Sequence, residues 1–123
     1  MDPATLPRYR YTVDPHDVIT SVCPLWLAFA RENGAPQLTR EAVVGRSLWD
    51  FIAGAETQQL YQTLLQRVRA KNASTVVPFR CDSPTLRRYM RLELTPEPNG
   101  SVQFDGVLER VEQTVPYNLL DQN

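Results

Sequence analysis

The chain has 123 residues, of which 42% are hydrophobic and 22% are charged, and its formal net charge at pH 7 is −1. This size and composition are typical of one folded domain and too small for two. The near-neutral charge excludes a general electrostatic attraction to nucleic acid or membrane lipid, and no segment approaches the roughly 20 apolar residues of a membrane span. We therefore expect neither nucleic acid nor membrane as a partner.

Two further observations favour the cytoplasm. Residues 1–10 contain Pro3, Pro7 and charged side chains where a signal peptide needs an apolar stretch. Cys23 and Cys81 lie far apart and lack the spacing of metal ligands. We interpret them as reduced thiols, with one long-range disulfide left open as the alternative.

The first predicted elements form a β-hairpin. Alternating aromatic and β-branched residues predict a strand over 8–13. Residues 14–17, Asp-Pro-His-Asp, have turn chemistry, because proline presets its backbone angle and aspartate side chains bind nearby amides. A second strand follows over 18–22.

Helical spacing dominates the middle of the chain. Pro24 suits the first turn of a helix and Gly34 suits the position just past its end. A short turn is predicted over 40–44, and Ser47 begins another apolar turn with capping chemistry. The longest helix is predicted over 56–72. Its apolar side is expected to consist of Leu60, Leu64, Leu65 and Val68.

The period then changes to two, which predicts three more strands. Residues 77–82 and 89–94 alternate between apolar and polar side chains, and Asn99-Gly100 is a strong turn signal. The last strand is predicted over 101–112, with a bulge at Gly106 because the alternation slips there. The pattern indicates an α+β fold in which helices cover one face of an antiparallel sheet, a layer that can enclose a pocket.

Three segments in this order resemble the PAS domain family. They are the Asp-containing hairpin at 14–22, the apolar helix at 25–30, and the stretch Gly-Arg-Ser-Leu-Trp-Asp-Phe-Ile at 45–52. The resemblance covers residues 8–112 by element order. It implies a five-stranded antiparallel sheet with short helices and one long helix across a face. It also implies a sensor or dimerisation module that binds a small molecule or a partner.

The resemblance divides the chain into an N-terminal arm (1–8), a PAS-like domain (9–112) and a C-terminal tail or connector (113–123). Met1 favours an intact N-terminus, and the end at Asn123 leaves the other side open. The chain is therefore either a stand-alone regulator of bacterial type or a piece of a longer protein.

A ligand cavity between the helices and the sheet would be mostly apolar, like most small-molecule sites. We expect its lining to include seven residues from the predicted helices and strands. They are Phe29, Trp49, Phe51, Tyr61, Phe79, Met90 and Leu92. The alternative is that these side chains form a plain core, since composition alone does not separate the two.

The resemblance also allows two cofactors to be tested. The flavin photoreceptor branch of the family carries a reactive cysteine in the helix after the Gly45-like position, where this chain has Leu48 and Trp49. Haem sensing generally needs an axial ligand, most often histidine, and the single histidine, His16, falls in the predicted hairpin turn. The sequence therefore argues against covalent flavin photochemistry and against His-ligated haem, and leaves the cofactor unknown.

Four arginines lie close together near Tyr89 and form the most conspicuous charge cluster. They are Arg80, Arg87, Arg88 and Arg91. Guanidinium groups bind carboxylate or phosphate through paired donors. The competing interpretation is a solvated sheet face on which these arginines pair with Asp82, Glu93 and Glu109.

Three hypotheses for function follow. The first is a PAS-type sensory or regulatory domain that binds a small apolar or partly polar ligand and relays its presence to a signalling partner. The second is a ligand-free interaction or homodimerisation module that uses the outer sheet face. Its surface would include Tyr9, Tyr11, Tyr89 and Val107.

The third hypothesis is a small enzyme that uses a cavity carboxylate, but no pair of carboxylates favours it. A nucleophilic Cys81 would need a neighbouring base, and His16 is the only imidazole. The chain has no phosphate-cradling glycine-rich loop, no paired histidines and no nucleophile elbow. We therefore expect no enzymatic activity, no catalytic residues and no metal site.

Overall fold

The computed structural model describes residues 6–82 and 85–113. Within these residues the chain forms three α-helices, five strands and two short 3₁₀ turns, at Leu48–Asp50 and Pro98–Gly100. The helices and strands are, in chain order, β1 (Arg8–Val13), β2 (Ile19–Val22), α1 (Pro24–Glu32), α2 (Arg40–Val43), α3 (Ala55–Lys71), β3 (Thr75–Asp82), β4 (Leu86–Pro96) and β5 (Val102–Gln113).

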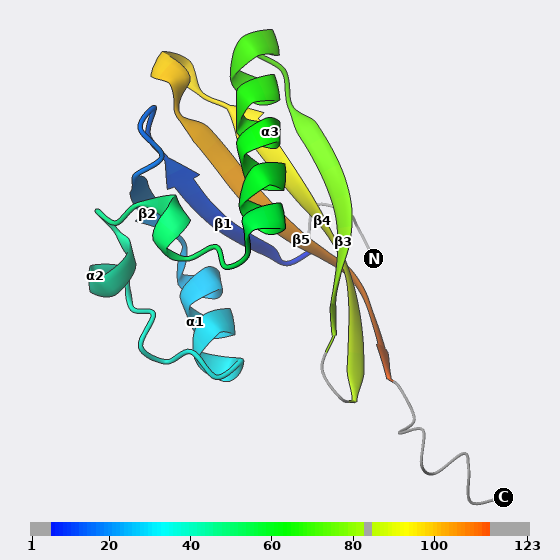
Figure 1. Ribbon diagram of the computed structural model, residues 1–123. Coiled ribbons are helices and arrows are strands. Elements are labelled where there is room, and N and C mark those ends of the chain that lie inside the picture. The colour runs from blue at the N-terminus through cyan, green and yellow to red at the C-terminus, as the bar shows by residue number, and fades with distance from the viewer. Residues whose placement is uncertain (1–5, 83–84, 114–123) are drawn as a thin grey trace, which may run out of the picture.

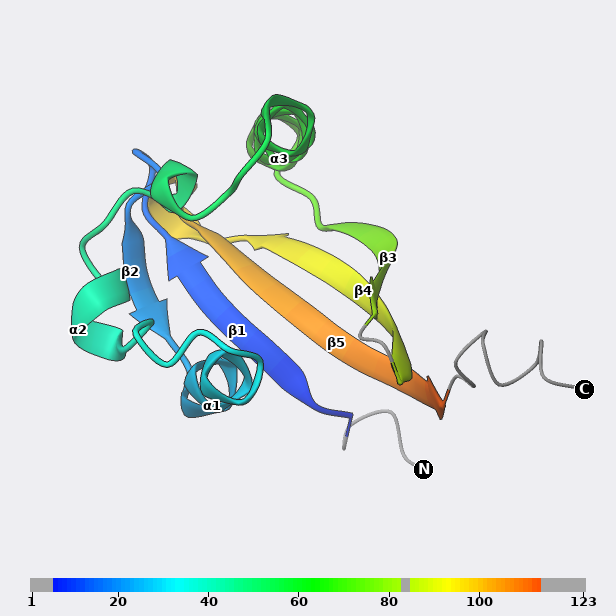
Figure 2. The same ribbon diagram turned by 60° about the horizontal axis from the view of Figure 1, so that its bottom comes forward.

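The strands form one antiparallel sheet in the order β2-β1-β5-β4-β3 (Figure 1). α3 packs against β4 and β5, α1 against β1, and α2 against β2. Figure 2, which looks along α3, shows this helix set apart from the sheet as a separate layer. The prediction of a five-stranded antiparallel sheet with helices covering one face is confirmed.

Local capping chemistry explains where the helices begin and end. The Sγ of Cys23 accepts a hydrogen bond from the backbone N–H of Trp26 at the start of α1. Thr39 caps α2 in the same way through its hydroxyl, 3.3 Å from the N–H of Ala42. α3 ends at Asn72, which adopts the left-handed conformation (φ 49°) that asparagine tolerates better than most residues. The helix boundaries in the sequence were therefore readable from short-range signals.

The buried stripe of α3 differs from the predicted one at its first position. Leu64, Leu65 and Val68 are buried as expected, but Leu60 is 48% exposed and its prediction as a core residue is wrong. Tyr61 packs against the core instead. Positions 61, 64, 65 and 68 follow the spacing of one helical face, and Leu60 lies one residue outside it.

The core lies between the helices and the inner face of the sheet, which we define as the face that the helices cover. Phe104 at its centre is fully buried. The other members of the main buried cluster are Val13, Ile19, Val43, Leu48, Leu64, Leu65, Val68, Leu92, Leu94 and Val102.

The hairpin between β4 and β5 turns at Asn99 (φ 70°) and Gly100 (φ 82°), as the Asn-Gly signal predicted. The predicted bulge at Gly106 is wrong. Gly106 pairs in register with both Tyr9 and Leu92. The register shifts further along β5, where Leu108 pairs with Met90 and Arg110 with Tyr89, so that Glu109 is the additional residue.

Arg69 of α3 joins the helix to two hairpin turns. Its Nη2 lies 2.9 Å from Oδ1 of Asp17 and donates to the carbonyl of Asp14. Its Nε donates to the carbonyl of Gly100. The indole Nε1 of Trp49 donates to the other carboxylate oxygen of Asp17, at 3.2 Å. These contacts fix one end of α3 over the sheet.

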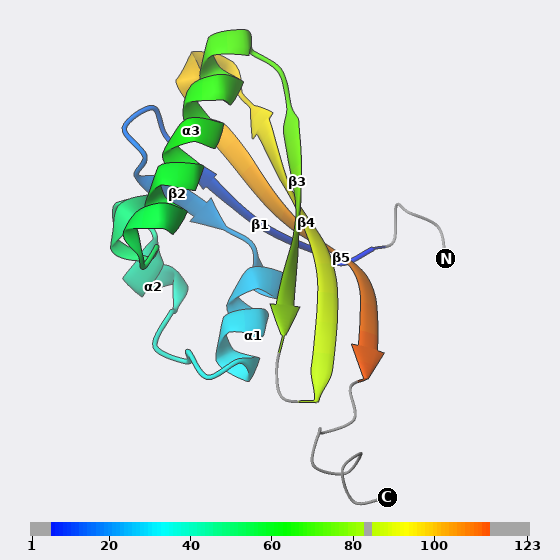
Figure 3. The same ribbon diagram turned by 45° about the vertical axis from the view of Figure 1, so that its right-hand side comes forward.

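β4 and β5 continue past the first residue of β1, since Arg8 pairs with Val107 whereas the β4–β5 ladder runs on to Gln113 (Figure 3). The predicted arm and tail lie largely outside the described residues. None of the helices in 6–82 and 85–113 has the length and apolar character needed to cross a membrane.

Candidate functional site

Two adjoining cavities lie between the helices and the inner face of the sheet. The first has a volume of about 230 Å³ and the second about 160 Å³. Tyr11, Trp26 and Tyr61 line both of them. These three aromatic residues come from β1, α1 and α3, so the sheet and two helices each supply part of the shared wall.

A stack of aromatic rings orders this shared wall. The rings of Tyr11 and Phe104 are nearly parallel, with centroids 4.7 Å apart and an interplanar angle of 9°. Tyr61 lies parallel to Phe104 at 6.1 Å and 13°. Trp26 meets Tyr11 edge to face at 6.5 Å. Such offset and edge-on arrangements suit the quadrupoles of aromatic rings, so the stack is a well-ordered apolar surface.

The segment between α2 and α3 forms one side of the first cavity. Ser47 caps the 3₁₀ turn that carries Leu48, and Phe51 and Ile52 follow directly. The amide nitrogen of Gln58 donates to the carbonyl of Ile52 at 2.8 Å, which ties this segment to α3. The remaining lining residues are Ile19 and Val43.

The second cavity lies between α1 and the strands β3, β4 and β5. Phe29 packs against Tyr9 with a centroid distance of 4.8 Å, and the guanidinium of Arg88 lies 5.8 Å from the centre of the Phe29 ring. The other lining residues are Phe79, Cys81, Met90, Leu92 and Gly106.

The structure brings six of the seven predicted ligand-binding residues to these cavities. Phe51 lines the first, Tyr61 lines both, and four line the second. Those four are Phe29, Phe79, Met90 and Leu92. Trp49 is the exception, since it is absent from the described lining of either cavity and instead packs against the core and binds Asp17.

Sequence reasoning missed the two residues at the centre of the site, Tyr11 and Trp26. Trp26 was not among the seven predicted lining residues, and Tyr11 was assigned to the outer face together with Tyr9. That assignment is wrong, because Tyr9 and Tyr11 point inward while Arg8 and Arg10 point outward. The alternation of β1 could have shown this, because Arg8 and Arg10 alternate with the two tyrosines and arginines favour the solvated face of a strand.

The tyrosines of the cavity walls are protonated phenols. Burial raises the pKa of Tyr11 well above its ordinary value of 10.0, and the neighbouring Tyr61 raises it further. Burial also raises the pKa of Tyr61 and of Tyr9. All three hydroxyls therefore remain neutral hydrogen-bond donors through the physiological range.

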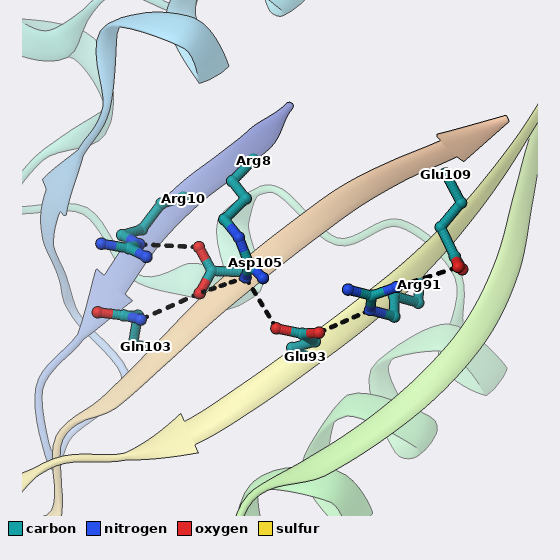
Figure 4. Close-up of polar contacts among 7 residues, drawn as sticks. All are labelled: Arg8, Arg10, Arg91, Glu93, Gln103, Asp105 and Glu109. Carbon is teal, nitrogen blue, oxygen red and sulfur yellow. Dashed lines mark hydrogen bonds and ion pairs between the residues drawn. The ribbon is translucent and has the colours of Figure 1, made fainter. Parts of the chain in front are cut away.

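The opposite face of the sheet, which we call the outer face, carries a network of ion pairs (Figure 4). Arg10 donates to Asp105 at 2.8 Å and Gln103 donates to its other oxygen at 3.0 Å. Arg8 lies between Asp105 and Glu93, 2.9 Å from the latter. Arg91 extends the network by binding both Glu93 and Glu109.

Burial of the carboxylate distinguishes this network from an ordinary surface. The Asp105 side chain is only 3% exposed. Its hydrogen bond to Arg10 raises the pKa of that guanidinium, and the bonds from Arg91 and Arg8 lower the pKa of Glu93. The network therefore favours the charged form of Glu93 and holds the arginines on the outer face.

The predicted arginine cluster divides between the two faces. Arg91 pairs with Glu93 and Glu109 as expected for a solvated face, and Arg87 lies 3.6 Å from Glu112. The prediction that all four arginines lie on one solvated face is wrong for Arg88. This arginine pairs across the ladder with Cys81 on the inner face and lies over Phe29, because strand alternation separates it from its neighbours.

The remaining candidate residues lie in three different parts of the fold. His16 is exposed in the β1–β2 turn, where its N–H binds Asp14. Cys23 and Cys81 are free thiols, the former capping α1 and the latter in the second cavity. Among residues 6–82 and 85–113, no group of three or more histidine, cysteine or acidic side chains could hold a metal ion.

Comparison with known proteins places the fold. No protein-family model and no curated protein sequence matches the chain. Several solved structures do match. A sensory box sensor histidine kinase from Vibrio cholerae superposes with a TM-score of 0.64 at 12% identity, covering 90% of this chain and 86% of that one.

Two further solved structures match over a similar share of this chain. A domain of an HTR-like protein from Haloarcula marismortui has a TM-score of 0.51 at 15% identity, covering 89% of this chain and 99% of that one. The Aer2 receptor from Vibrio cholerae, described as a dual PAS-heme oxygen sensor, has a TM-score of 0.51 at 13% identity, covering 85% and 96%. At these identities the likeness establishes the fold, and the chain therefore has the fold of PAS domains.

Proposed function

We propose that this chain is a sensory or regulatory domain that binds a small ligand in the two adjoining cavities and relays its presence to a signalling partner. The observation that carries the proposal is the shared wall of Tyr11, Trp26 and Tyr61. A ligand on that wall contacts the sheet, α1 and α3 together. Its binding free energy therefore depends on how these elements are placed, which is the requirement for a ligand to shift a conformational equilibrium.

The comparisons support a sensory role, since two of the matching structures are of a sensory box sensor histidine kinase and a PAS-heme oxygen sensor. The lining of the two cavities supports binding rather than catalysis. Neither lining, as the structure describes it, contains a carboxylate, a histidine or a lysine. We place the domain in the cytoplasm, as its sequence indicated, with a homodimer or a signalling protein as its partner.

The stack of Tyr11 on Phe104 gives a route from the cavity to the rest of the sheet. Tyr11 lies on β1 and Phe104 directly opposite on β5. A ligand that moves the Tyr11 ring also changes the packing of Phe104. Since β5 continues to Gln113, such a change is transmitted toward the C-terminal segment.

Native and denaturing mass spectrometry of freshly purified protein test ligand binding. A mass excess present only in the native spectrum supports the proposal and identifies the ligand. Ile52→Phe, which fills part of the first cavity, should lower the retained fraction several-fold. Leu60→Ala, an exposed position on α3, should leave it unchanged. A clean apo mass that persists with added cell extract would count against a ligand-binding domain.

A ligand-free homodimer is the second candidate, favoured by the ion-pair network on the outer face. The network alternates arginines with carboxylates, so two copies related by a two-fold axis offer each other opposite charges. The arginines remain reachable, since the Arg10 side chain is 47% exposed and that of Arg8 37%. Of the four residues first expected there, Tyr89 and Val107 lie on this face.

Sedimentation equilibrium distinguishes this candidate from the first. A dimer that forms with rising concentration, and that Arg10→Glu disrupts, supports the outer-face interface. Arg46→Glu is the matched control, because Arg46 is similarly exposed but lies between α2 and α3. A monomer at all concentrations would rule out the homodimer.

A further inference from the structure

The hydroxyls of Tyr11 and Tyr61 are polar groups in a mostly apolar cavity wall, to which Tyr9 and Cys81 add a hydroxyl and a thiol in the second cavity only. Both rings line both cavities. The two side chains are neighbours, since both rings stack on Phe104 and Tyr61 raises the pKa of Tyr11. Among the described residues, no side chain or backbone group forms a hydrogen bond with either hydroxyl.

Hydroxyls in such a place need a partner from outside the chain. Neither hydroxyl oxygen is among the fully buried atoms that lack a partner, so water can reach both from the cavities. A ligand that displaces this water must supply a hydrogen bond in its place, because a covered, unpaired polar group loses its bonds to water without replacement. The neighbouring residues are hydrocarbon or aromatic, and the fully buried Phe104 lies against both rings. The partner is therefore water or a ligand that occupies the cavity.

The rest of the lining restricts the chemistry of that ligand. Within the described linings of both cavities there is no charged side chain. An ionised ligand in the first cavity would lie among uncharged side chains without a counter-charge in the lining, which is costly. The guanidinium of Arg88 lies over Phe29, beside the second cavity. The near-parallel rings of Tyr11, Phe104 and Tyr61 favour a flat molecule. Protonated phenols offer O–H donors, so the ligand should bring an acceptor.

We propose that the hydroxyls of Tyr11 and Tyr61 anchor a small, flat, uncharged ligand through a hydrogen-bond acceptor such as a carbonyl oxygen or ring nitrogen. This inference rests on the proposed function, since it names the ligand class of the same site. The cavities, at about 230 and 160 Å³, are each smaller than the roughly 300–1,000 Å³ that holds a drug-sized ligand. One or two rings are the expected size.

Three probes that share one ring test the class of ligand. Benzamide carries an uncharged carbonyl, benzoate carries a charge, and toluene carries no acceptor. Dissociation constants come from titrations of the whole isotope-labelled chain followed by NMR, with signals of the cavity residues as the readout. We expect benzamide to bind at least tenfold more tightly than benzoate.

The anchor itself is tested with Tyr11→Phe and Tyr61→Phe, singly and together. A hydrogen bond contributes about three- to tenfold in affinity, so the double variant should bind benzamide about tenfold or more weakly and bind toluene as before. Tyr89→Phe, on the outer face, is the matched control and should change neither affinity. Thermal unfolding of each variant verifies that it is folded.

The outcomes separate this inference from the proposed function. Benzamide and toluene that bind equally, with no effect of the Phe variants, would overturn the anchor while leaving a ligand-binding domain. Benzoate that binds as tightly as benzamide would overturn the uncharged class. Failure of all three probes to bind would overturn the anchor, and the retained ligand in the native mass spectrum then decides the proposed function independently.

Discussion

On the inner face of the sheet Phe104 packs between Tyr11 and Tyr61, whereas on the outer face the next residue of β5, Asp105, binds Arg10 and Gln103. Both side chains are almost completely buried. One is stabilised by removal of apolar surface from water and the other by charge-assisted hydrogen bonds. Adjacent residues of one strand thus belong to two chemically different layers.

The comparison indicates where binding chemistry remains available. On the outer face the buried carboxylate already has its donors, supplied by this chain. On the inner face two hydroxyls and two cavities have no such partners among the described residues. The side chains of the outer face are therefore already paired with one another, whereas the inner face has space and unpaired O–H donors for a ligand.

Phe104→Ala tests the inner layer and should have the largest effect. It removes a fully buried ring that contacts both cavity tyrosines, so the free energy of unfolding should fall by about 3–5 kcal/mol. Urea denaturation measures the loss. Phe104→Leu keeps most of the apolar volume and should cost clearly less. A loss below about 1 kcal/mol for the alanine variant would mean that the inner core repacks freely.

Asp105→Ala tests the outer layer and should cost less, about 1–3 kcal/mol, because its hydrogen bonds to Arg10 and Gln103 are lost. The two nearby arginines are partly exposed and can return to water, which limits the cost. Asp105→Asn should fall between wild type and alanine. Equal losses for Asp105→Ala and Phe104→Ala in urea would contradict the distinction between the layers.

Stability in acid should depend on Glu93. Hydrogen bonds from Arg91 and Arg8 lower its pKa in the folded state below the ordinary value of 4.5. A lowered folded pKa means that the contribution of Glu93 is complete above pH 4.5 and is lost as the pH falls through the folded value. Glu93→Gln should therefore flatten the fall in unfolding free energy below pH 4.5, measured by urea titrations at several pH values.

This acid effect should be smaller than that of Asp105→Ala, because Glu93 is the more exposed carboxylate. The hydrogen bond from the Val18 N–H lowers the pKa of Asp14. Asp14 therefore also contributes to the fall in unfolding free energy at acid pH, and it is still present in the Glu93→Gln variant. An unchanged slope in Glu93→Gln would show that the ion pairs of Glu93 do not stabilise the fold.

Arg110→Ala should have the smallest effect. The Arg110 side chain is 61% exposed and its ion pair with Glu112 is long, at 3.6 Å. Exposed pairs typically contribute about 0–1 kcal/mol. Its guanidinium also lies 4.0 Å from the centre of the Tyr89 ring. The midpoint temperature of thermal unfolding measures the effect. If it falls as far as in Asp105→Ala, the exposed end of this face contributes as much to stability as its buried centre.

Most of the fold was predictable from local signals. Pro24 and Gly34 located α1, a threonine cap located α2, the Asn99-Gly100 turn located the β4–β5 hairpin, and alternation located the strands. These features depend on neighbours within a few residues, which the sequence displays directly. The failures have a different cause. The bulge at Glu109 and the exposure of Leu60 depend on how strands pair and how α3 docks.

The candidate site was predicted in part for the same reason. Side chains such as Phe79, Met90 and Leu92 alternate on strands, so their inward direction follows from period two. Trp49 and Trp26 are both aromatic residues at helical turns, and nothing local shows that one binds Asp17 while the other faces the cavities. That choice depends on contacts between distant segments.

The sequence by itself therefore determined the order of elements, the α+β layering and the apolar character of the inner face, because each is encoded in spacing and capping along the chain. Only the tertiary structure decided that Tyr11, Trp26 and Tyr61 meet, that Asp105 is buried against Arg10, and that two hydroxyls lack a partner among the described residues. The physical reason is that cavities and buried polar networks arise where separate elements pack, and packing geometry is a property of the assembled layers.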